Sequence, residues 1–223
     1  LSILEACPND RQTLLFSATL PEKLNDHLGV LLKEPLSIQV EEEIEEADIR
    51  EWAFVFKNEP YSELLVLMAQ PWIRYAIVFC HTRQEAEETY QRLKAARRGQ
   101  VAILHGGLTQ KDRLQTIKRF KNHELQILVA SDLAGRGLHI EALDLVVNMG
   151  FPKDKENYIH RIGRTGRAGL KGTALTFVHT SECFRWEEME AYTGRSIERL
   201  DHLSDLLPLM EVKAPLAPGD HKQ

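Results

Sequence analysis

From residue 51 onward, short apolar runs alternate regularly with segments of helical pattern. Several of these runs are almost continuously apolar, as in residues 76–80 (Ala-Ile-Val-Phe-Cys) and 127–130 (Ile-Leu-Val-Ala). Strands that helices cover on both faces have this character, whereas half-exposed strands alternate apolar with polar residues. The pattern therefore predicts one complete α/β domain, with a mostly parallel sheet and helices on both faces.

The alternation is regular enough to assign each expected element a range. We expect strands at 51–56, 75–80, 101–104, 126–130, 144–148 and 172–178. We expect helices at 59–70, 83–97, 109–122, 154–163 and 181–193. Ligands of an open parallel sheet bind outside the carboxyl ends of its strands. The loops to search for a site therefore follow residues 80, 104, 130, 148 and about 163.

A shorter set of elements precedes residue 51. We expect a buried strand at 13–17, a helix at 21–33 with Pro21 at its first position, and a short strand at 36–40. Residues 41–51 then carry seven acids against one Arg. A solvated acidic run is typical of an exposed linker, so we expect one at 41–49.

Composition excludes several classes of protein. The chain has 223 residues, of which 43% are hydrophobic and 27% charged, as in an ordinary globular protein. The longest apolar runs have only several residues, as at 64–69, whereas a membrane-spanning helix needs about 20. Residues 1–5 lack a Met and a basic segment before an apolar core, so we expect neither a signal peptide nor a natural start. The chain is therefore interpreted as a fragment.

Cysteine usage and charge add further expectations. Cys7, Cys80 and Cys183 stand far apart with no Cys-x-x-Cys pair, so we expect no zinc site, no other metal and no disulfide framework. A reducing, cytoplasmic location fits such a chain best. The net charge of −5 does not indicate nucleic-acid binding. Outside the acidic run, basic residues cluster at 92–98, 111–121 and 161–171, although clusters of this kind are usually solvated helix faces.

The most informative segment is residues 158–169, Tyr-Ile-His-Arg-Ile-Gly-Arg-Thr-Gly-Arg-Ala-Gly. Three arginines at spacing three alternate with three glycines at the same spacing. Glycines let a backbone approach a ligand closely, and arginines offer planar forks that match phosphate oxygens. A basic turn that caps a helix is one alternative. A dinucleotide loop is another, but the spacing is not Gly-x-Gly-x-x-Gly and the segment follows a helix.

The pattern His-Arg-x-Gly-Arg-x-x-Arg is complete here, and it resembles motif VI of superfamily 2 helicases. With Thr165 and Gly166 it resembles the DEAD-box RNA helicase family closely. Residues 130–140, which follow a buried strand, resemble motif V of the same family. His139 departs from this family, which usually has at that position an Asp that holds the ribose hydroxyls of ATP. A His can still donate or accept one hydrogen bond there.

Three weaker motifs support the resemblance by their order and spacing. Residues 76–82 resemble motif IV, residues 105–113 resemble the Gln-x-x-Arg element, and residues 12–19 end in the Ser-Ala-Thr of motif III. The sequence contains no Gly-x-x-x-x-Gly-Lys-[Ser/Thr] phosphate loop and no Asp-Glu-Ala-Asp box. Residues 45–48 (Glu-Glu-Ala-Asp) mimic the box by coincidence, since they lie after motif III in a solvated run.

The resemblance implies a role for each matching residue. Arg164 and Arg167 would be the catalytic arginine fingers, and Gly137, His139, Arg164 and Arg167 would contact ATP. RNA contacts would come from Thr82, Gly107, Gln110, Arg113 and Ser131, at the same strand ends as the nucleotide. Coupling between the two RecA-like cores would involve Ser17, Thr19, Arg136, His160 and Arg161. No metal ligand is expected, because the missing first core would hold the Mg²⁺.

The resemblance also implies the domain organisation and the function. Residues 1–40 would be the end of a first RecA-like core, 41–49 the linker, 50–200 a second RecA-like domain and 201–223 a tail. The expected function is ATP-dependent RNA unwinding, with RNA bound through its backbone, the first core as partner in cis and no membrane. One alternative is a non-catalytic fragment that binds RNA or a protein, and another is a DNA helicase of the same superfamily. The residue identities in these motifs favour an RNA helicase over a DNA helicase.

Overall fold

A computed structural model describes residues 6–8, 10–16, 32, 35–38, 49–96, 100–132, 140, 143–166 and 172–205. The chain divides into two compact units, Leu1–Glu43 and Ile44–Gln223. The second unit contains all the helices and strands described below.

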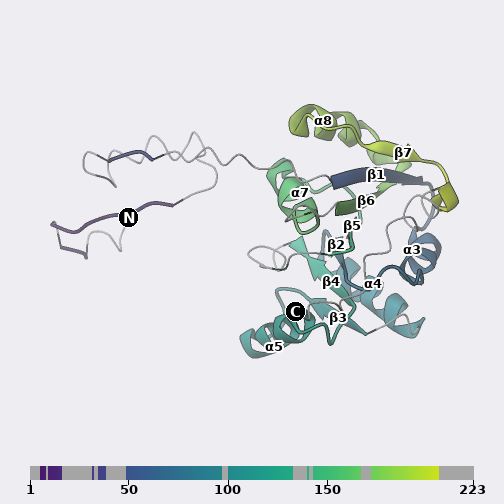
Figure 1. Cartoon of the computed structure of the whole chain (residues 1–223), viewed down its shortest axis with the longest axis horizontal. Coiled ribbons are helices and arrows are strands. Elements are labelled where there is room, and N and C mark those ends of the chain that lie inside the picture. Colours follow the sequence, from purple (N-terminus) through teal and green to yellow (C-terminus); the bar gives the residue numbers. More distant parts are fainter. Residues whose placement is uncertain are drawn as a thin grey trace, which may run out of the picture. The chain divides into compact units, whose positions relative to one another are not determined.

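The second unit is built on a sheet of seven parallel strands (Figure 1). The strands are β1 (Ile49–Phe56), β2 (Ala76–Cys80), β3 (Val101–Leu104), β4 (Ile127–Ser131), β5 (Leu145–Asn148), β6 (Gly172–His179) and β7 (Glu198–Leu200). Their order across the sheet is β3-β4-β2-β5-β6-β1-β7. This order makes β3, β4 and β2 neighbours. The loops that follow them therefore lie side by side at the carboxyl ends of the strands, which we call the carboxyl edge of the sheet.

Helices cover both faces of the sheet. They are α3 (Tyr61–Met68), α4 (Arg83–Ala95), α5 (Gln110–Lys121), α7 (Lys155–Ile162) and α8 (Phe184–Thr193), with single 3₁₀ turns η1 (Thr180–Glu182) and η2 (Leu203–Asp205). Three of the helices begin at a side chain that accepts a backbone N–H of the first turn. These caps are Thr82 for α4, Thr109 for α5 and Asp154 for α7. Such a cap satisfies a donor that has no partner within the helix.

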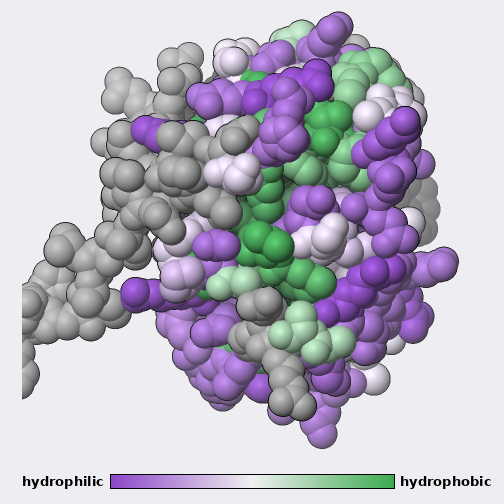
Figure 2. All heavy atoms as spheres, turned by 90° about the vertical axis from the view of Figure 1, so that its right-hand side faces the viewer, coloured by the Kyte–Doolittle hydropathy of each residue, from purple (hydrophilic) through white to green (hydrophobic). Residues whose placement is uncertain are grey.

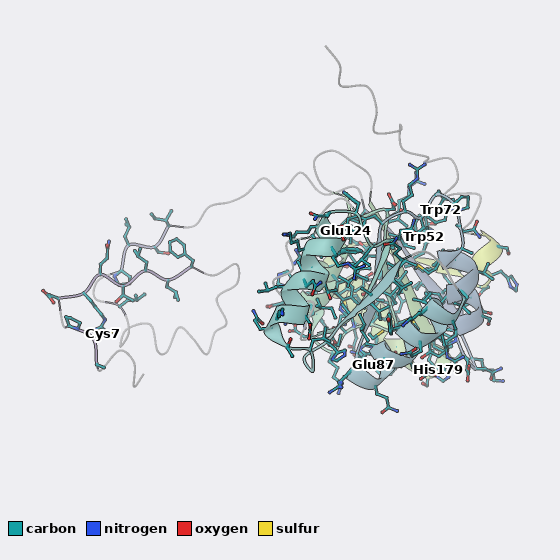
Figure 3. The ribbon with its side chains drawn as sticks, turned by 90° about the horizontal axis from the view of Figure 1, so that it is seen from below. Cys7, Trp52, Trp72, Glu87, Glu124 and His179 are labelled. Atoms are coloured by element: carbon teal, nitrogen blue, oxygen red, sulfur yellow. The ribbon has the colours of Figure 1, made fainter. Side chains whose placement is uncertain are left out.

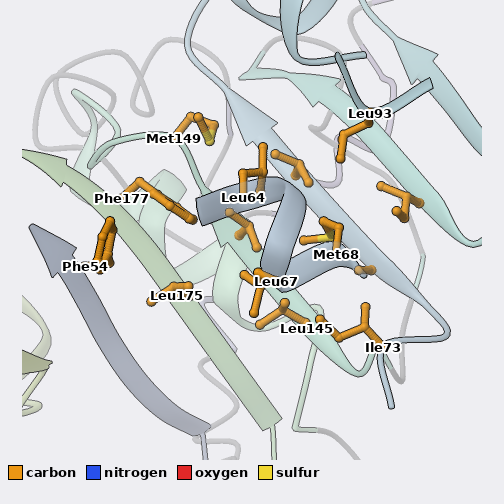
Figure 4. Packing of buried hydrophobic residues seen from close by; sticks show 14 of the residues in the cluster. Phe54, Leu64, Leu67, Met68, Ile73, Leu93, Leu145, Met149, Leu175 and Phe177 are labelled. Atoms are coloured by element: carbon orange, nitrogen blue, oxygen red, sulfur yellow. The ribbon is translucent and has the colours of Figure 1, made fainter. Parts of the chain in front are cut away.

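One face of the sheet packs against α3 and α4. Leu64, Leu67 and Met68 of α3 point at the strands, where Phe54 and Phe177 meet edge to face with ring centroids 5.4 Å apart (Figure 4). On the side of the molecule that faces right in Figure 1, apolar side chains gather in a band flanked by hydrophilic residues (Figure 2).

The other face packs against α5, α7 and α8. Phe120 of α5 is fully buried against β2 and β4 and stacks on Tyr75 at 4.3 Å. Tyr158 and Ile162 of α7 and Met189 of α8 form a third cluster over β1 and β6. Apolar residues on both faces of each central strand explain why these strands are almost continuously apolar in sequence.

The α/β class with a parallel sheet and helices on both faces is confirmed. Every strand and helix expected after residue 51 is present, with ends that shift by up to three residues. Two elements were not anticipated. Strand β7 has only three residues, two of them charged, and η2 follows it with Leu203 buried in the core.

The described part of the first unit differs from expectation. Residues 13–16 and 36–38 form no strand, and Leu14 and Phe16 are 66% and 88% exposed. The predictions of a buried strand at 13–17 and of a short strand at 36–40 were therefore wrong for these residues. An apolar run becomes a strand only where a neighbouring strand pairs with it, and none of the described residues does so here. The helix expected at 21–33 lies outside the described residues except for Leu32, which is not helical. The linker expected at 41–49 likewise lies outside them except for Ile49, which begins β1.

A buried carboxylate links β1 to two helices. Glu51 accepts a hydrogen bond from the Tyr158 hydroxyl of α7 at 2.8 Å, and Arg195, just after α8, pairs with its other oxygen at 3.3 Å. Beside it, Trp52 Nε1 donates to the Glu198 carboxylate of β7 at 3.0 Å (Figure 3). Burial raises the pKa of Glu51 above its ordinary value of 4.5, although the bonds from Tyr158 and Arg195 oppose that rise. The same burial raises the pKa of Tyr158.

The raised pKa of Glu51 predicts a pH-dependent effect of Glu51→Gln. As the pH rises above 4.5, Glu51 loses its proton in the unfolded chain while it keeps it in the folded chain. Ionisation therefore favours the unfolded chain, and the free energy of unfolding falls as the pH rises toward the folded-state pKa of Glu51. Gln cannot ionise, and its carbonyl oxygen can still accept from Tyr158. We therefore expect urea denaturation to show the variant gaining stability relative to the original chain as the pH rises above about 4.5. Glu188→Gln, at an exposed position on α8, is the control for the charge change. A constant difference across this range would contradict the prediction.

No helix among the described residues is both long and apolar enough to cross a membrane.

Candidate functional site

Arg161 of α7 reaches the carboxyl ends of the central strands. Its Nη1 donates to Asn148 Oδ1 at the end of β5 at 3.0 Å, and its Nη2 donates to the carboxylate of Asp132, directly after β4. The guanidinium also lies over the ring of Phe79 in β2, 5.2 Å from its centroid. Only 5% of the Arg161 side chain is exposed. One cation therefore ties α7 to three adjacent strands.

Two neighbours complete this cluster. The imidazole of His81 lies 3.9 Å from Asp132. Burial alone would raise the pKa of Asp132, but His81 and the positive charge of Arg161 outweigh it and hold that pKa below its ordinary value of 3.8. The carboxylate therefore stays ionised beside the arginine. Gly150 packs against the ring of His81 at a φ of +96°, where a Cβ would come within 2.5 Å of Nε2. Only glycine fits this position without strain.

Three predicted RNA-binding residues lie at the ends of three adjacent strands. Ser131 is the last residue of β4 and is buried, and Thr82 follows β2. The Thr82 hydroxyl accepts the N–H of Glu85 at 3.1 Å, and the Glu85 carboxylate accepts the N–H of His81 at 2.7 Å. These bonds fix the turn from β2 into α4.

Gly107 lies in the corresponding turn after β3. Its N–H donates to Nδ1 of the buried His105 at 3.0 Å. Nε2 of that ring lies 2.9 Å from the Glu87 carboxylate of α4 (Figure 3), so it carries the ring proton and donates it. Gln110 and Arg113 follow in the first turn of α5. The structure thus brings together the five predicted RNA-binding residues at one edge of the sheet.

Arg164 lies at the opposite edge. Its carbonyl oxygen accepts the N–H of Leu143, which precedes β5, at 3.3 Å. The hydroxyl of Thr165 donates to the Leu143 carbonyl at 2.6 Å and accepts the N–H of Thr173, near the start of β6, at 3.3 Å. Of the predicted nucleotide-binding residues, Arg164 alone is among the described residues, and its backbone lies at the amino ends of the strands rather than at the expected carboxyl ends. A loop that follows a helix returns to the amino ends of parallel strands, because the helix runs antiparallel to them.

The Arg164 side chain is half-buried, and its Nε donates to the carbonyl oxygen of the exposed His160 at 3.1 Å. Arg161, expected to couple the two cores, has its described contacts within the second unit. The remaining predicted site residues lie outside the described residues. They are Ser17, Thr19, Arg136, Gly137, His139 and Arg167.

The sequence did not single out His81, Asp132 or Asn148 as site residues. Each of them ends or follows an apolar strand. A polar residue at the carboxyl end of a buried strand is a signal for a site, but it does not say which distant arginine completes the cluster. Within the described ranges, no group of three His, Cys, Asp or Glu side chains is arranged to hold a metal ion.

Comparisons with known proteins define the class. Residues 60–169 match the family model described as helicase conserved C-terminal domain. A structure of Saccharomyces cerevisiae Dbp5 bound to RNA and ADP BeF3 is similar to 94% of this chain and 56% of that one, with a TM-score of 0.77 and 28% identity. The second unit is therefore a RecA-like helicase C-terminal domain.

The family follows from further similarities. The Escherichia coli DEAD-box protein SrmB, in a complex with regulator of ribonuclease activity A, is 31% identical, with a TM-score of 0.62 over 69% of this chain and 91% of that one. The ATP-dependent RNA helicase RhlB of Haemophilus influenzae is 40% identical over 199 residues, which are 87% of this chain and 48% of that protein. The DEAD-box ATP-dependent RNA helicase CshA of Geobacillus kaustophilus is 38% identical over 202 residues, or 89% and 43%. The chain belongs to the DEAD-box family. It spans about half the length of the curated relatives it matches.

Proposed function

We propose that this chain is the second half of an ATP-dependent RNA helicase. In this proposal residues 1–40 are the end of the first RecA-like core, 41–49 the linker, 50–200 the second domain and 201–223 a tail. The observation that carries it is the complete His-Arg-x-Gly-Arg-x-x-Arg motif, on α7 and the loop after it, in a domain of the DEAD-box family.

The proposed chemistry assigns the two edges of the sheet to different ligands. Arg164 and Arg167 would face the γ-phosphate of ATP held on the first core, and they would neutralise the charge that develops as water displaces ADP. Phosphoryl transfer depends mainly on positioning and charge neutralisation, which is what arginines supplied by a second domain contribute. Mg²⁺ would be held by the first core. Gly137 would approach the nucleotide through its backbone, and His139 would stand near the ribose.

RNA would lie along the carboxyl edge. Thr82, Gly107, Gln110, Arg113 and Ser131 offer hydroxyl, amide, guanidinium and backbone groups, which suit phosphates and 2′-hydroxyls rather than base edges. Binding would therefore be independent of sequence. Closure of both cores on one strand would melt a short duplex locally, and ATP hydrolysis would reset the open state.

The direct test is RNA-stimulated ATP hydrolysis by the chain alone, by the first core alone and by the two together. We expect activity only in the mixture, because the sequence has no phosphate loop of its own. Activity in the mixture that RNA does not stimulate would contradict the RNA assignment. No activity in the mixture would contradict the helicase assignment and make His139 the first position to examine.

The second candidate function is a non-catalytic fragment that binds RNA or a partner protein. Partner binding has support among relatives, since SrmB has been solved with a protein partner. RNA binding by the chain, with no hydrolysis in any mixture, would select this candidate. The cytoplasmic location stays a prediction.

A further inference from the structure

The outward face of α5 carries a row of lysines. Successive helix residues turn by about 100°, so Lys111, Leu114, Lys118 and Lys121 lie along one side. All four are exposed, Leu114 by 58%. The opposite side carries the fully buried Phe120. We call Lys111, Lys118 and Lys121 the lysine stripe.

The charge of the lysine stripe is not neutralised by its surroundings. Within the part of the chain that the structure describes, none of the three lysines forms an ion pair. Other arginines on the described surface are paired. Arg92 of α4 lies 2.8 Å from Glu88, and Arg119 lies 3.5 Å from Glu124. A merely solvated helix face usually has such acidic neighbours at helical spacing. The stripe is thus a local positive surface on a chain whose net charge is −5.

The stripe begins beside Gln110, at the end of α5 that carries the predicted RNA residues. Gln110 and Arg113 lie in the first turn of α5, and Lys121 is its last residue. At a rise of 1.5 Å per residue, the helix carries the stripe about 16 Å from Gln110. Phosphates of one strand follow one another at about 3.4 Å along a regular helix axis, so this distance spans several of them.

We propose that the lysine stripe binds the phosphate backbone of RNA that extends beyond the site at the carboxyl edge. This inference rests on the proposed function and deepens it. A longer RNA would bind more tightly than one that covers the edge alone. The added contacts would be electrostatic and independent of base sequence. An acidic protein segment would also fit the charge, but the position of Lys111 beside Gln110 on the same helix favours RNA.

The test compares two single-stranded RNAs, of about 6 and about 16 nucleotides, by fluorescence anisotropy at low salt. The protein is the 223-residue chain and its Lys118→Gln/Lys121→Gln variant. We expect the variant to bind the long RNA about tenfold more weakly and the short RNA as before. Two lost phosphate contacts should also reduce the salt dependence for the long RNA by about 1.4 in log–log slope.

The matched control is Arg74→Gln/Lys94→Gln, which removes the same charge from two exposed positions outside α5. We expect it to bind both RNAs nearly as the original chain does. Gln and Lys have similar helix propensities, so the α5 variant should keep its fold, which its thermal unfolding checks. Three outcomes would overturn the inference. The α5 variant could weaken binding of both RNAs equally, it could weaken binding no more than the control does, or it could leave the affinity unchanged. If the original chain binds neither RNA, the RNA-binding part of the proposed function fails, and this inference with it.

Discussion

Replacing Arg164 by Glu should lower RNA-stimulated ATP hydrolysis by at least about 10³-fold in the two-core enzyme that we propose. An arginine that reaches a γ-phosphate from a second domain contributes about 10³–10⁵ in rate. Glu removes that contribution and places a negative charge beside a negatively charged transition state. The loop itself should persist, because its anchors to the sheet are the Arg164 carbonyl oxygen and the Thr165 hydroxyl, both of which the substitution leaves in place.

The measurement is steady-state ATP turnover with saturating RNA, with RNA affinity determined in parallel. Arg164 lies at the edge opposite the predicted RNA residues, so RNA affinity without nucleotide should change little. Lys155→Glu, in the first turn of the same helix, makes the same charge change outside the proposed site and should leave turnover near normal. Unchanged turnover in Arg164→Glu would end the assignment of this residue as an arginine finger.

The central strands could be predicted because the pattern that indicates each one lies within a few consecutive residues. The five residues of β2 and the first four of β4 are all apolar, and that pattern admits few structures other than a strand covered on both faces. Strand β7 had no such pattern, since two of its three residues are charged and it forms by pairing with β1. The prediction at residues 13–16 shows the reverse error, a strand that was expected and is not observed. They have the composition of a buried strand but no described partner.

The roles proposed for the site residues stay predictions, but the structure shows where the described ones lie. The motifs identified Arg164 and the five residues of the carboxyl edge, but they did not reveal that α7 carries the chain back to the opposite edge. Arg161 illustrates the same difficulty. The family resemblance implied that it couples the two cores, whereas its described contacts bury it against Asp132 and Asn148. Burial depends on the sheet order, which brings β4 and β5 to either side of β2, and the sequence does not determine that order.

The contrast between these two arginines leads to the second large prediction, which concerns stability. Arg161→Met should lower the free energy of unfolding by about 3 kcal/mol, because removing one partner of a buried ion pair leaves the other uncompensated. The value lies at the low end of such effects, since 26% of the Asp132 side chain is exposed and water can partly solvate its charge. Met keeps most of the side-chain volume, so the loss would reflect charge and hydrogen bonds more than a cavity.

A double-mutant cycle separates the ion pair from general disruption. Arg161→Met/Asp132→Asn removes the uncompensated carboxylate, so it should be more stable than Arg161→Met alone, by about 1 kcal/mol or more. The measurement is urea denaturation of the four proteins at neutral pH. If the double variant is as unstable as the two single losses added together, the pair makes no coupled contribution, and Arg161 acts only through Asn148 and Phe79. If coupling is found, the arginine that the resemblance assigned to coupling between the cores also holds α7 in place, and Arg164 then follows a helix whose position the buried pair fixes.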